Sequence, residues 1–274
     1  MATTHTAQDI LKTQAILECS PDTPISQATD KLRSSHDAVF VLNSSHVLGV
    51  VNPYHSLSRR RSFNNNTKAE TVMFSPPRLK PSTPFPEIAR LMLESKIYYL
   101  PVQDQHDKLL GIASIRRLLN AYLQDSSLLN SLPLIPITTQ NLITLPQSEN
   151  VITALNLMRD HKISHLPLTD DSGKLAGLLT LFDLRYLLVG PVPSQSRFSL
   201  KGNKDQYLDQ PVTDYTTPMP VTVTNHPEVS SVISTMLDHD IGSLIGINTN
   251  QKPTGIITHH DVLNAIVTSQ NVPV

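Results

Sequence analysis

A short motif that recurs four times constrains the fold of this 274-residue chain more than any other feature. The motif is a glycine followed by two apolar residues and one polar residue, and its glycines lie 62, 66 and 78 residues apart. Periodic self-similarity on this scale is typical of a chain built from repeated supersecondary units. The four occurrences are Gly49-Val-Val-Asn52, Gly111-Ile-Ala-Ser114, Gly177-Leu-Leu-Thr180 and Gly255-Ile-Ile-Thr258.

The segments around each motif predict the same order of helices and strands. In the last copy, apolar residues at i, i+3, i+4, i+7 and i+8 predict an amphipathic helix; they are Val229, Val232, Ile233, Met236 and Leu237. Apolar stretches such as 163–168 lie between such helices and the motif, and polar turns follow them, which predicts hairpins. We therefore expect an α/β fold of four β-α-β-β-α units, at about residues 8–58, 70–125, 135–190 and 211–270.

This unit resembles the CBS domain, a family named after cystathionine β-synthase. The resemblance is strongest in Gly177-Leu-Leu-Thr-Leu-Phe-Asp183 and Gly255-Ile-Ile-Thr-His-His-Asp261. In this family two units pair through their sheets into a Bateman module, and the cleft between them binds adenosine-containing ligands. The resemblance implies two tandem modules, residues 1–129 and 130–274, as in free-standing four-unit prokaryotic proteins and the γ subunit of AMP-activated protein kinase.

Two of the four motifs are followed by an aspartate at the same distance. Asp183 and Asp261 each come three residues after a threonine, Thr180 or Thr258. An ionised carboxylate can accept hydrogen bonds from both hydroxyls of a ribose, and a hydroxyl at a helix start can donate to a phosphate. The alternative is that each aspartate only caps a helix. Because the pair recurs in register with the repeat, we favour ligand binding.

The resemblance also implies which residues contact adenine: those of the first strand and of the strand before the motif. For the Asp183 site these are Asn141, Leu142, Ile143, His165 and Leu166, and for the Asp261 site Val221, Thr222, Val223, Ser243 and Leu244. The apolar members would lie in the core with or without a ligand, and His165 could instead satisfy a nearby carbonyl group. Histidine side chains, which titrate near neutral pH, can also donate hydrogen bonds to an anion. The candidates are His161, His165, His239, His259 and His260.

The amino-terminal module departs from the pattern. At the carboxylate position it has His55 and Arg117, and arginine has no hydrogen-bond acceptor for a ribose. We therefore expect a structural role for residues 1–129 and ligand binding by residues 130–274. The alternative is that Lys96, Arg116 and Arg117 attract a phosphate or the carboxylates of a partner, although adjacent arginines on a helix more often form a solvated face. The amino-terminal half carries a net charge of +3 and the carboxy-terminal half −4. An anion bound by the acidic half must be held by local donors.

Composition excludes several other functions. The net charge of −1 does not favour a nucleic-acid partner, and with 9 glycines the chain has no GxGxxG or GxxxxGK[ST] phosphate cradle. Its single cysteine, Cys19, excludes a disulfide framework and is expected to be buried. No run of about 18 apolar residues is present, so we expect no membrane contact and place the protein in the cytoplasm.

These observations lead to one expected function and two rivals. We expect a sensor of adenine nucleotides without catalysis or a required cofactor, with AMP, ADP or ATP ahead of S-adenosylmethionine or a dinucleotide. A homodimer or a separate regulated protein would receive the signal. The first rival is a ligand-free interaction scaffold. The second is an enzyme acting on a nucleotide, for which no nucleophile–base pair or metal ligand set stands out.

Overall fold

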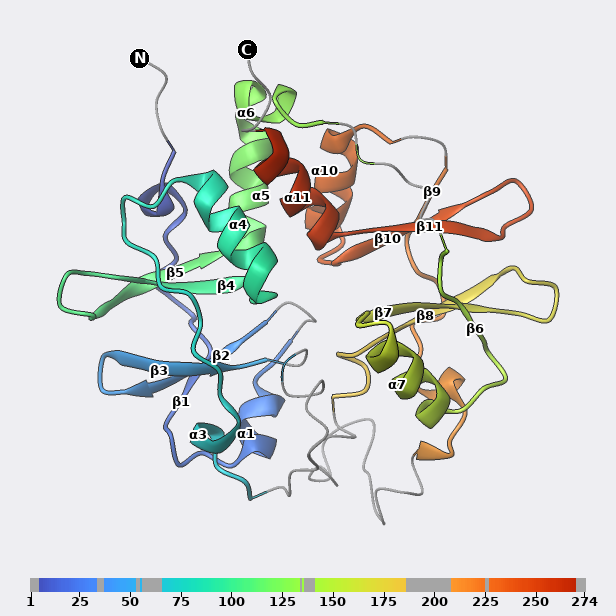
Figure 1. Ribbon diagram of the computed structural model, residues 1–274, viewed down its shortest axis with the longest axis horizontal. Helices are drawn as coiled ribbons and strands as arrows, with labels where there is room; N and C mark the ends of the chain where they lie inside the picture. The colour runs from blue at the N-terminus through green and yellow to red at the C-terminus, as the bar shows by residue number, and fades with distance from the viewer. Residues whose placement is uncertain are drawn as a thin grey trace.

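The computed structural model describes residues 5–33, 37–52, 55, 66–133, 135, 141–185, 208–224 and 227–269. Its strands form four small sheets, and we call the corresponding parts of the chain units one to four (Figure 1). Three sheets have three strands, in the orders β1-β2-β3, β6-β7-β8 and β9-β10-β11, and the sheet of unit two has the pair β4-β5. The predicted α/β fold is confirmed.

The helices and strands are divided among the four units in the order of the chain. Unit one contains η1 (Ala7–Ile10), β1 (Glu18–Cys19), α1 (Ile25–Asp30), β2 (Val39–Asn43) and β3 (His46–Val51). Unit two contains α3 (Ala69–Val72), α4 (Phe85–Ser95), β4 (Tyr99–Gln103), β5 (Leu109–Ser114), α5 (Ile115–Gln124) and α6 (Ser126–Asn130). Unit three contains β6 (Leu145–Pro146), α7 (Val151–Asp160), β7 (His165–Thr169) and β8 (Leu175–Thr180). Unit four contains η2 (Val212–Asp214), β9 (Thr222–Val223), α10 (Val229–Asp238), β10 (Ser243–Ile247), β11 (Pro253–Thr258) and α11 (His259–Ser269).

The recurrent glycine fixes the same strand register in every unit. In the four antiparallel pairs it lies opposite Val41, Val102, Leu168 and Gly246, and an irregularity of the register follows that position each time. Because side chains alternate between the faces of a strand, a shared register puts equivalent residues of all four units on equivalent faces. The sequence repeat is therefore a structural repeat at the level of single residues.

Units pair because the segment that leads into one unit bridges the last strand of its partner. Phe74, at the start of unit two, pairs with Val50 of β3, and Lys12, at the start of unit one, pairs with Ile112 of β5. The segment leading into unit four makes the matching bridge to β8, from Thr217 to Leu178. Units one and two thus form one Bateman-type pair, and units three and four form the other.

The same crossing explains why the motif begins with glycine. A Cβ atom on Gly111 would lie 2.5 Å from the carbonyl oxygen of Lys12, and one on Gly177 would lie 2.4 Å from Cγ2 of Thr216. Both distances are shorter than any normal van der Waals contact. The partner's leading segment can cross the strand only where no side chain is present.

Helices join the two pairs. The predicted apolar stripe of α10 is confirmed, because its five residues are all buried. α4 packs against α11 and α5 packs against α10, so the four helices gather between the sheets of units two and four (Figure 1). One apolar core runs through both units and includes Ile88, Leu118, Val232 and Ile266. Units one and three are also in contact, because Phe182 of unit three packs against the core of unit one, in which Cys19 is buried.

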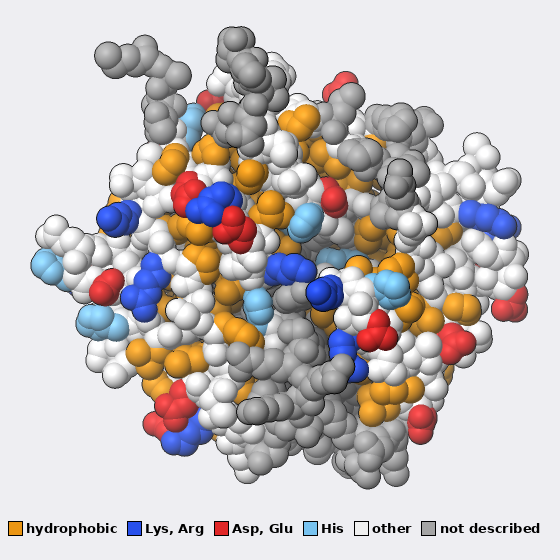
Figure 2. Space-filling model, viewed as in Figure 1, with side chains coloured by type: hydrophobic (Ala, Val, Ile, Leu, Met, Phe, Trp, Pro, Cys, Tyr) orange, Lys and Arg blue, Asp and Glu red, His pale blue; other side chains and the backbone are white. Residues whose placement is uncertain are grey.

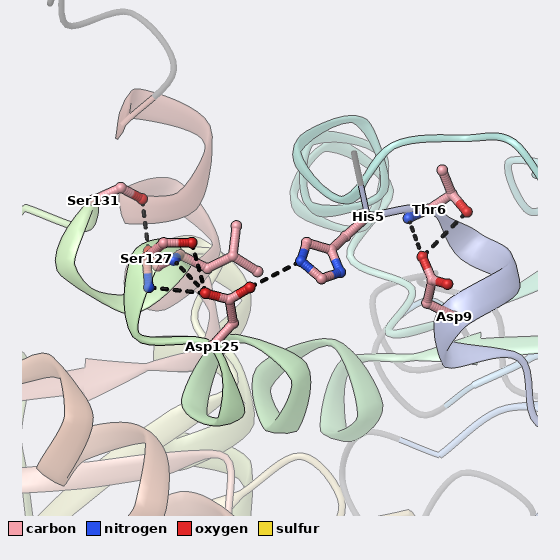
Figure 3. Close-up of polar contacts among 7 residues, drawn as sticks. His5, Thr6, Asp9, Asp125, Ser127 and Ser131 are labelled. Atoms are coloured by element: carbon pink, nitrogen blue, oxygen red, sulfur yellow. Dashed lines mark hydrogen bonds and ion pairs between the residues drawn. The ribbon is translucent and has the colours of Figure 1, made fainter. Parts of the chain in front are cut away.

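Residues 5–12, which we call the amino-terminal arm, lie against unit two. The N–H of Phe85 donates to the carbonyl oxygen of His5 at 3.1 Å, and the N–H of Ala7 donates to that of Thr83 at 2.8 Å. The imidazole of His5 stacks on Phe85 with ring centroids 5.3 Å apart, and its Nε2 lies 2.9 Å from Oδ2 of Asp125 (Figure 3). Asp125 also caps α6, so the arm is tied to the helix at the end of the amino-terminal module.

Candidate functional site

In units three and four, the threonine of each predicted threonine–aspartate pair is hydrogen-bonded to the aspartate of the same pair. β8 ends at Thr180, whose backbone N–H and Oγ1 both donate to Oδ2 of Asp183, at 2.8 and 2.6 Å. β11 ends at Thr258, which makes the same two bonds to Oδ2 of Asp261, at 2.7 and 2.8 Å, where α11 begins. Each aspartate therefore closes the junction that follows its strand.

This arrangement changes what each side chain can offer a ligand. A threonine hydroxyl has one proton, and the hydroxyls of Thr180 and Thr258 give theirs to the aspartates, so phosphate donors have to come from elsewhere. A carboxylate has about four lone-pair positions, and the junction uses two of them. The remaining two match the two hydroxyls of a ribose. Capping and ribose binding are therefore compatible at Asp183 and Asp261.

The carboxyl group of Asp183 is half-buried, and its environment is mixed. Burial raises the pKa of Asp183 above its ordinary value, while the hydrogen bonds from Thr180 and the positive charge of Arg185 oppose this rise. Arg185 lies over the ring of Phe182, 3.7 Å from its centroid, and donates to the Phe182 carbonyl oxygen at 2.7 Å. A second hydrogen-bonding group, such as a ribose hydroxyl, would stabilise the ionised form of Asp183.

At the equivalent junctions of units one and two, the side chain at the aspartate position binds a backbone carbonyl group of the other unit. The side-chain oxygen of Asn52 accepts from the N–H of His55 at 2.9 Å, and Nε2 of His55 contacts the carbonyl oxygen of Ser95 at 2.7 Å. In unit two, Oγ of Ser114 accepts from the N–H of Arg117 at 3.3 Å, and the guanidinium of Arg117 donates to the carbonyl oxygen of Leu11 at 3.0 Å. These contacts hold units one and two together where units three and four have a carboxylate.

A cavity of about 270 Å³ lies where all four units meet. Lys, Arg and His side chains gather near the hollow in the middle of the face in Figure 2. The amino-terminal module supplies four of the lining residues: Asp37, Asn52, Lys96 and Tyr98. Units three and four supply Lys162, Ile163, Ser164, His165, Leu181, Phe182, Gly242, Ile256, Thr258, His259 and His260.

The lining follows the repeat. Asp37, Tyr98, Ser164 and Gly242 all line the cavity, and each lies four residues before the residue that pairs with the motif glycine. The four units thus present a carboxylate, a phenol, a hydroxyl and bare backbone at one common position. Aligning the repeats on their glycines identifies this position, but the sequence does not show that the four copies converge on one point.

Two lysines at another common position make the cavity cationic. Lys96 and Lys162 each lie six residues before the partner of the motif glycine, with φ of 54° and 55°. In unit four this place is taken by Asp240 (φ 52°), whose carboxylate is 2.8 Å from the guanidinium of Arg116. The three units therefore share the left-handed backbone at this helix-to-strand turn, and they differ in the side chain that it carries, which is lysine in units two and three and aspartate in unit four.

Among the described residues that line the cavity, Asp37 is the one carboxylate. Its Oδ2 accepts a hydrogen bond from the N–H of Arg33 at 2.6 Å. Burial and the neighbouring Asp37 carboxylate raise the pKa of Tyr99, which hydrogen-bonds to it. Two lysines and three histidines face this single acid, so the cavity favours an anion.

The structure brings part of the predicted site together. His165, Thr258 and His259 line the cavity, and His259 is buried. Thr180, Asp183 and Asp261 are half-buried at the two junctions just described. Leu166 and Ser243 are buried at the starts of β7 and β10, and Ile143, Val221 and Val223 are partly buried against the cores of their units. Sequence reasoning missed Lys162 and Ser164, and it assigned no ligand contact to Asp37, Asn52 or Tyr98.

The described part of the chain offers neither a membrane span nor a metal site. It contains no helix that is long and apolar enough to cross a membrane. In the same residues no group of three or more His, Cys, Asp or Glu side chains is placed to hold a metal ion, and this includes the neighbourhood of His259, His260 and Asp261.

Comparison with solved structures shows the same overall arrangement elsewhere. The fold matches protein MJ1225 of Methanocaldococcus jannaschii, considered an archaeal homologue of γ-AMPK, with a TM-score of 0.77, 18% identity and coverage of 95% of this chain and 99% of that one. It also matches a conserved uncharacterised protein of Pyrococcus horikoshii, with a TM-score of 0.63, 18% identity and coverage of 96% and 100%. At this level of identity the likeness concerns the fold.

Sequence comparison identifies the family. The uncharacterised protein MJ1404 of M. jannaschii is 24% identical over 265 residues, which are 93% of this chain and 61% of that protein. Inosine-5'-monophosphate dehydrogenase of Aquifex aeolicus is 36% identical over 118 residues, which are 43% of this chain and 24% of the enzyme. The chain thus spans less than two thirds of the length of these relatives. The sequence profile of the CBS domain matches residues 69–124, 135–190 and 212–268, and the protein belongs to the CBS domain family.

Proposed function

We propose that this protein is a regulatory sensor, without catalysis of its own, that binds an adenosine-containing ligand in its carboxy-terminal module. AMP, ADP and ATP are the first candidates. One observation carries the proposal: Thr258, which is hydrogen-bonded to Asp261, lines the same cavity as Lys96 and Lys162. A carboxylate able to accept hydrogen bonds from a ribose diol is therefore bonded to a residue that lines the cavity, and the same cavity holds two cations able to bind a phosphate.

The size of the cavity limits what enters it. Pockets that enclose a drug-sized ligand measure about 300 to 1,000 Å³, so in this proposal the cavity of about 270 Å³ would take the phosphate end of one nucleotide and leave the rest of the ligand outside it. The ribose would lie at the Thr258–Asp261 junction, and Lys162, His165 and His260 would face its phosphate. Thr180 and Asp183 would form the equivalent junction for a second ligand of the same class.

Adenine would lie on the strands next to these junctions. For the Asp261 site the proposed contacts are Val221, Val223 and Ser243, and for the Asp183 site Ile143, His165 and Leu166. Buried strand residues can recognise adenine by apolar contact and through backbone groups. His259, at the start of α11, would be placed between the base and the cavity.

Sensing requires that the ligand prefers one arrangement of the units over another. The cavity is lined by all four units, so a ligand that bridges them would favour the arrangement of the two modules in which all four units contact it. A second copy of this chain or a separate protein would read that arrangement.

Titration calorimetry of the full chain with adenosine, AMP, ADP, ATP, S-adenosylmethionine and NAD tests the proposal. We expect one adenine nucleotide to bind, and to bind more tightly than adenosine because of its phosphate. Lys162→Gln should remove that difference, whereas Lys174→Gln, at an exposed hairpin turn outside the cavity, should not. Analysis of the titrated mixtures for new products tests the absence of catalysis. Binding of none of the six compounds would reject the proposal.

The second candidate is a ligand-free interaction scaffold. It is favoured by the hydrogen bonds from Thr180 and Thr258, which give both aspartates a structural role without any ligand. A scaffold would bind none of the compounds and would keep its stability after neutralisation of Lys96 and Lys162. A sensor would lose nucleotide affinity in the same variants.

A further inference from the structure

One aromatic contact joins the amino-terminal module to the junction of unit four. α4 packs against α11, and Tyr98 follows α4 by three residues while His259 is the first residue of α11. The rings of Tyr98 and His259 meet edge to face, with centroids 5.6 Å apart and planes at 65°. Both residues line the central cavity.

His259 lies inside the proposed ligand motif, between Thr258 and Asp261. Its side chain is buried, and its backbone N–H donates to the carbonyl oxygen of Gly242 at 3.1 Å. The backbone of His259 is therefore anchored within unit four. Its ring is packed against a side chain of unit two.

Tyr98 is itself held by groups of the amino-terminal module. The N–H of Ile115 donates to its carbonyl oxygen at 2.9 Å. Just before it, the carbonyl oxygens of Ser95 and Lys96 accept hydrogen bonds from His55 and Asn52, at 2.7 and 3.4 Å. The junction of unit one, which lacks the aspartate, thus fixes the chain that carries Tyr98.

We propose that Tyr98 is a positioning residue for the ligand site of unit four, so that the amino-terminal module completes a site whose motif lies in the carboxy-terminal one. The inference rests on the proposed function. Tyr98 acts by orienting His259 toward the cavity. The amino-terminal module is then required for full affinity even though its own junctions carry no carboxylate.

The test uses the full chain with Tyr98→Leu and Tyr98→Phe, titrated with the adenine nucleotide that binds the unaltered protein most tightly. Leu keeps apolar bulk but has no ring, and an aromatic pair contributes enough for a loss of about 3- to 10-fold in affinity. Phe keeps the ring and should restore affinity to within about twofold. Thermal unfolding of each variant checks that the fold is retained.

A double-mutant cycle with His259→Ala makes the test specific to this contact. If Tyr98 acts through His259, Tyr98→Leu should weaken binding in the unaltered chain but have little further effect in the His259→Ala background. Equal effects in both backgrounds, or unchanged affinity of Tyr98→Leu, would overturn the inference and leave the proposed function standing. Failure of the unaltered protein to bind any nucleotide would reject the proposed function itself.

Discussion

Nε2 of His55 donates a hydrogen bond to the carbonyl oxygen of Ser95 at 2.7 Å, across the boundary between units one and two. A carbonyl oxygen can only accept, so Nε2 carries the proton. His55 occupies the position that is Asp183 in unit three and Asp261 in unit four. Its ring also contacts Phe74, with centroids 4.6 Å apart. The missing carboxylate of unit one is thus replaced by a contact that orders the last turn of α4.

Replacing His55 should therefore cost stability without creating a ligand site. His55→Asp removes the imidazole N–H that reaches the Ser95 carbonyl oxygen, and we expect a loss of about 1 to 3 kcal/mol because that acceptor loses its donor. Urea unfolding measures this loss. His46→Ala, at an exposed position of the adjoining hairpin, is the control and should change stability by less than about 0.5 kcal/mol. A stable His55→Asp variant that gains nucleotide binding would contradict this account.

Asp→Asn and Asp→Ala substitutions should separate the two roles of the junction aspartates. At Asp261, Asn keeps an oxygen that can accept from Thr258 but removes the charge, whereas Ala removes the acceptor and should cost about 1 kcal/mol of stability. We expect both variants to lose nucleotide affinity and only Ala to lose stability. Calorimetric titration and thermal unfolding of the two variants provide the readouts. Unchanged affinity in Asp183→Asn/Asp261→Asn would leave the aspartates with the capping role alone.

Gly111 and Gly177, two of the four motif glycines, should differ in their tolerance of a side chain. In Gly111→Ala the new Cβ would meet the backbone oxygen of Lys12, which can move only with the amino-terminal arm. In Gly177→Ala it would first meet Cγ2 of Thr216, the end of a side chain. We expect Gly111→Ala to cost about 1 to 3 kcal/mol and Gly177→Ala to cost less. Limited proteolysis should detect release of the arm in Gly111→Ala, and equal effects would contradict the crossing as the cause.

Much of the fold follows from local rules, and this part was predictable. The repeat places Gly49, Gly111, Gly177 and Gly255 in one register, and the stripe on α10 is buried as its periodicity requires. Asp183 and Asp261 bind the threonines three residues earlier, which their spacing allowed for. Each of these features is decided within one unit.

The rest depends on how units pack, which no local pattern encodes. Tyr98 and Lys96 belong to a module whose junctions lack aspartate, and they reach the cavity only because α4 packs against α11. The role of His55 likewise depends on Ser95, 40 residues away in another unit. The division of labour between the modules stays a prediction, and the cavity lined by both modules is a feature that the sequence did not predict.

The contact between His5 and Asp125 predicts a dependence of stability on pH. Hydrogen bonds from Ser127 and His5 lower the pKa of Asp125 to about 2 (Figure 3). A carboxyl group whose pKa is lower in the folded state than in the unfolded state stabilises the fold when the pH is above the unfolded-state pKa of about 4. This contribution to stability is lost as the pH falls toward 2. Asp125→Asn should remove the part of the pH dependence that lies between about pH 4 and 2. Thermal unfolding across this range measures it, and an unchanged slope would exclude Asp125 as its source.

The two modules should not behave as independent halves when they are separated. Cutting the chain after Leu129 would expose the faces of α4 and α5 on one fragment and of α10 and α11 on the other, because these helices share one apolar core. Faces of this kind drive association. We expect each fragment to form oligomers alone, and the two together to form a 1:1 complex, which sedimentation measurements would detect.

Nucleotide binding by the separated halves should follow the same logic. A fragment that held a complete site would be stabilised by about 2.7 kcal/mol at a hundredfold excess of nucleotide over its dissociation constant. The fragment from residue 130 onward keeps Asp183 and Asp261 but lacks Lys96 and Tyr98, so we expect weaker binding than in the full chain. Adding the fragment that ends at residue 129 should restore the affinity, and the same fragment carrying Tyr98→Leu should restore it less. Full affinity of the carboxy-terminal fragment alone would show that the cations and the aromatic ring of the amino-terminal module take no part in binding.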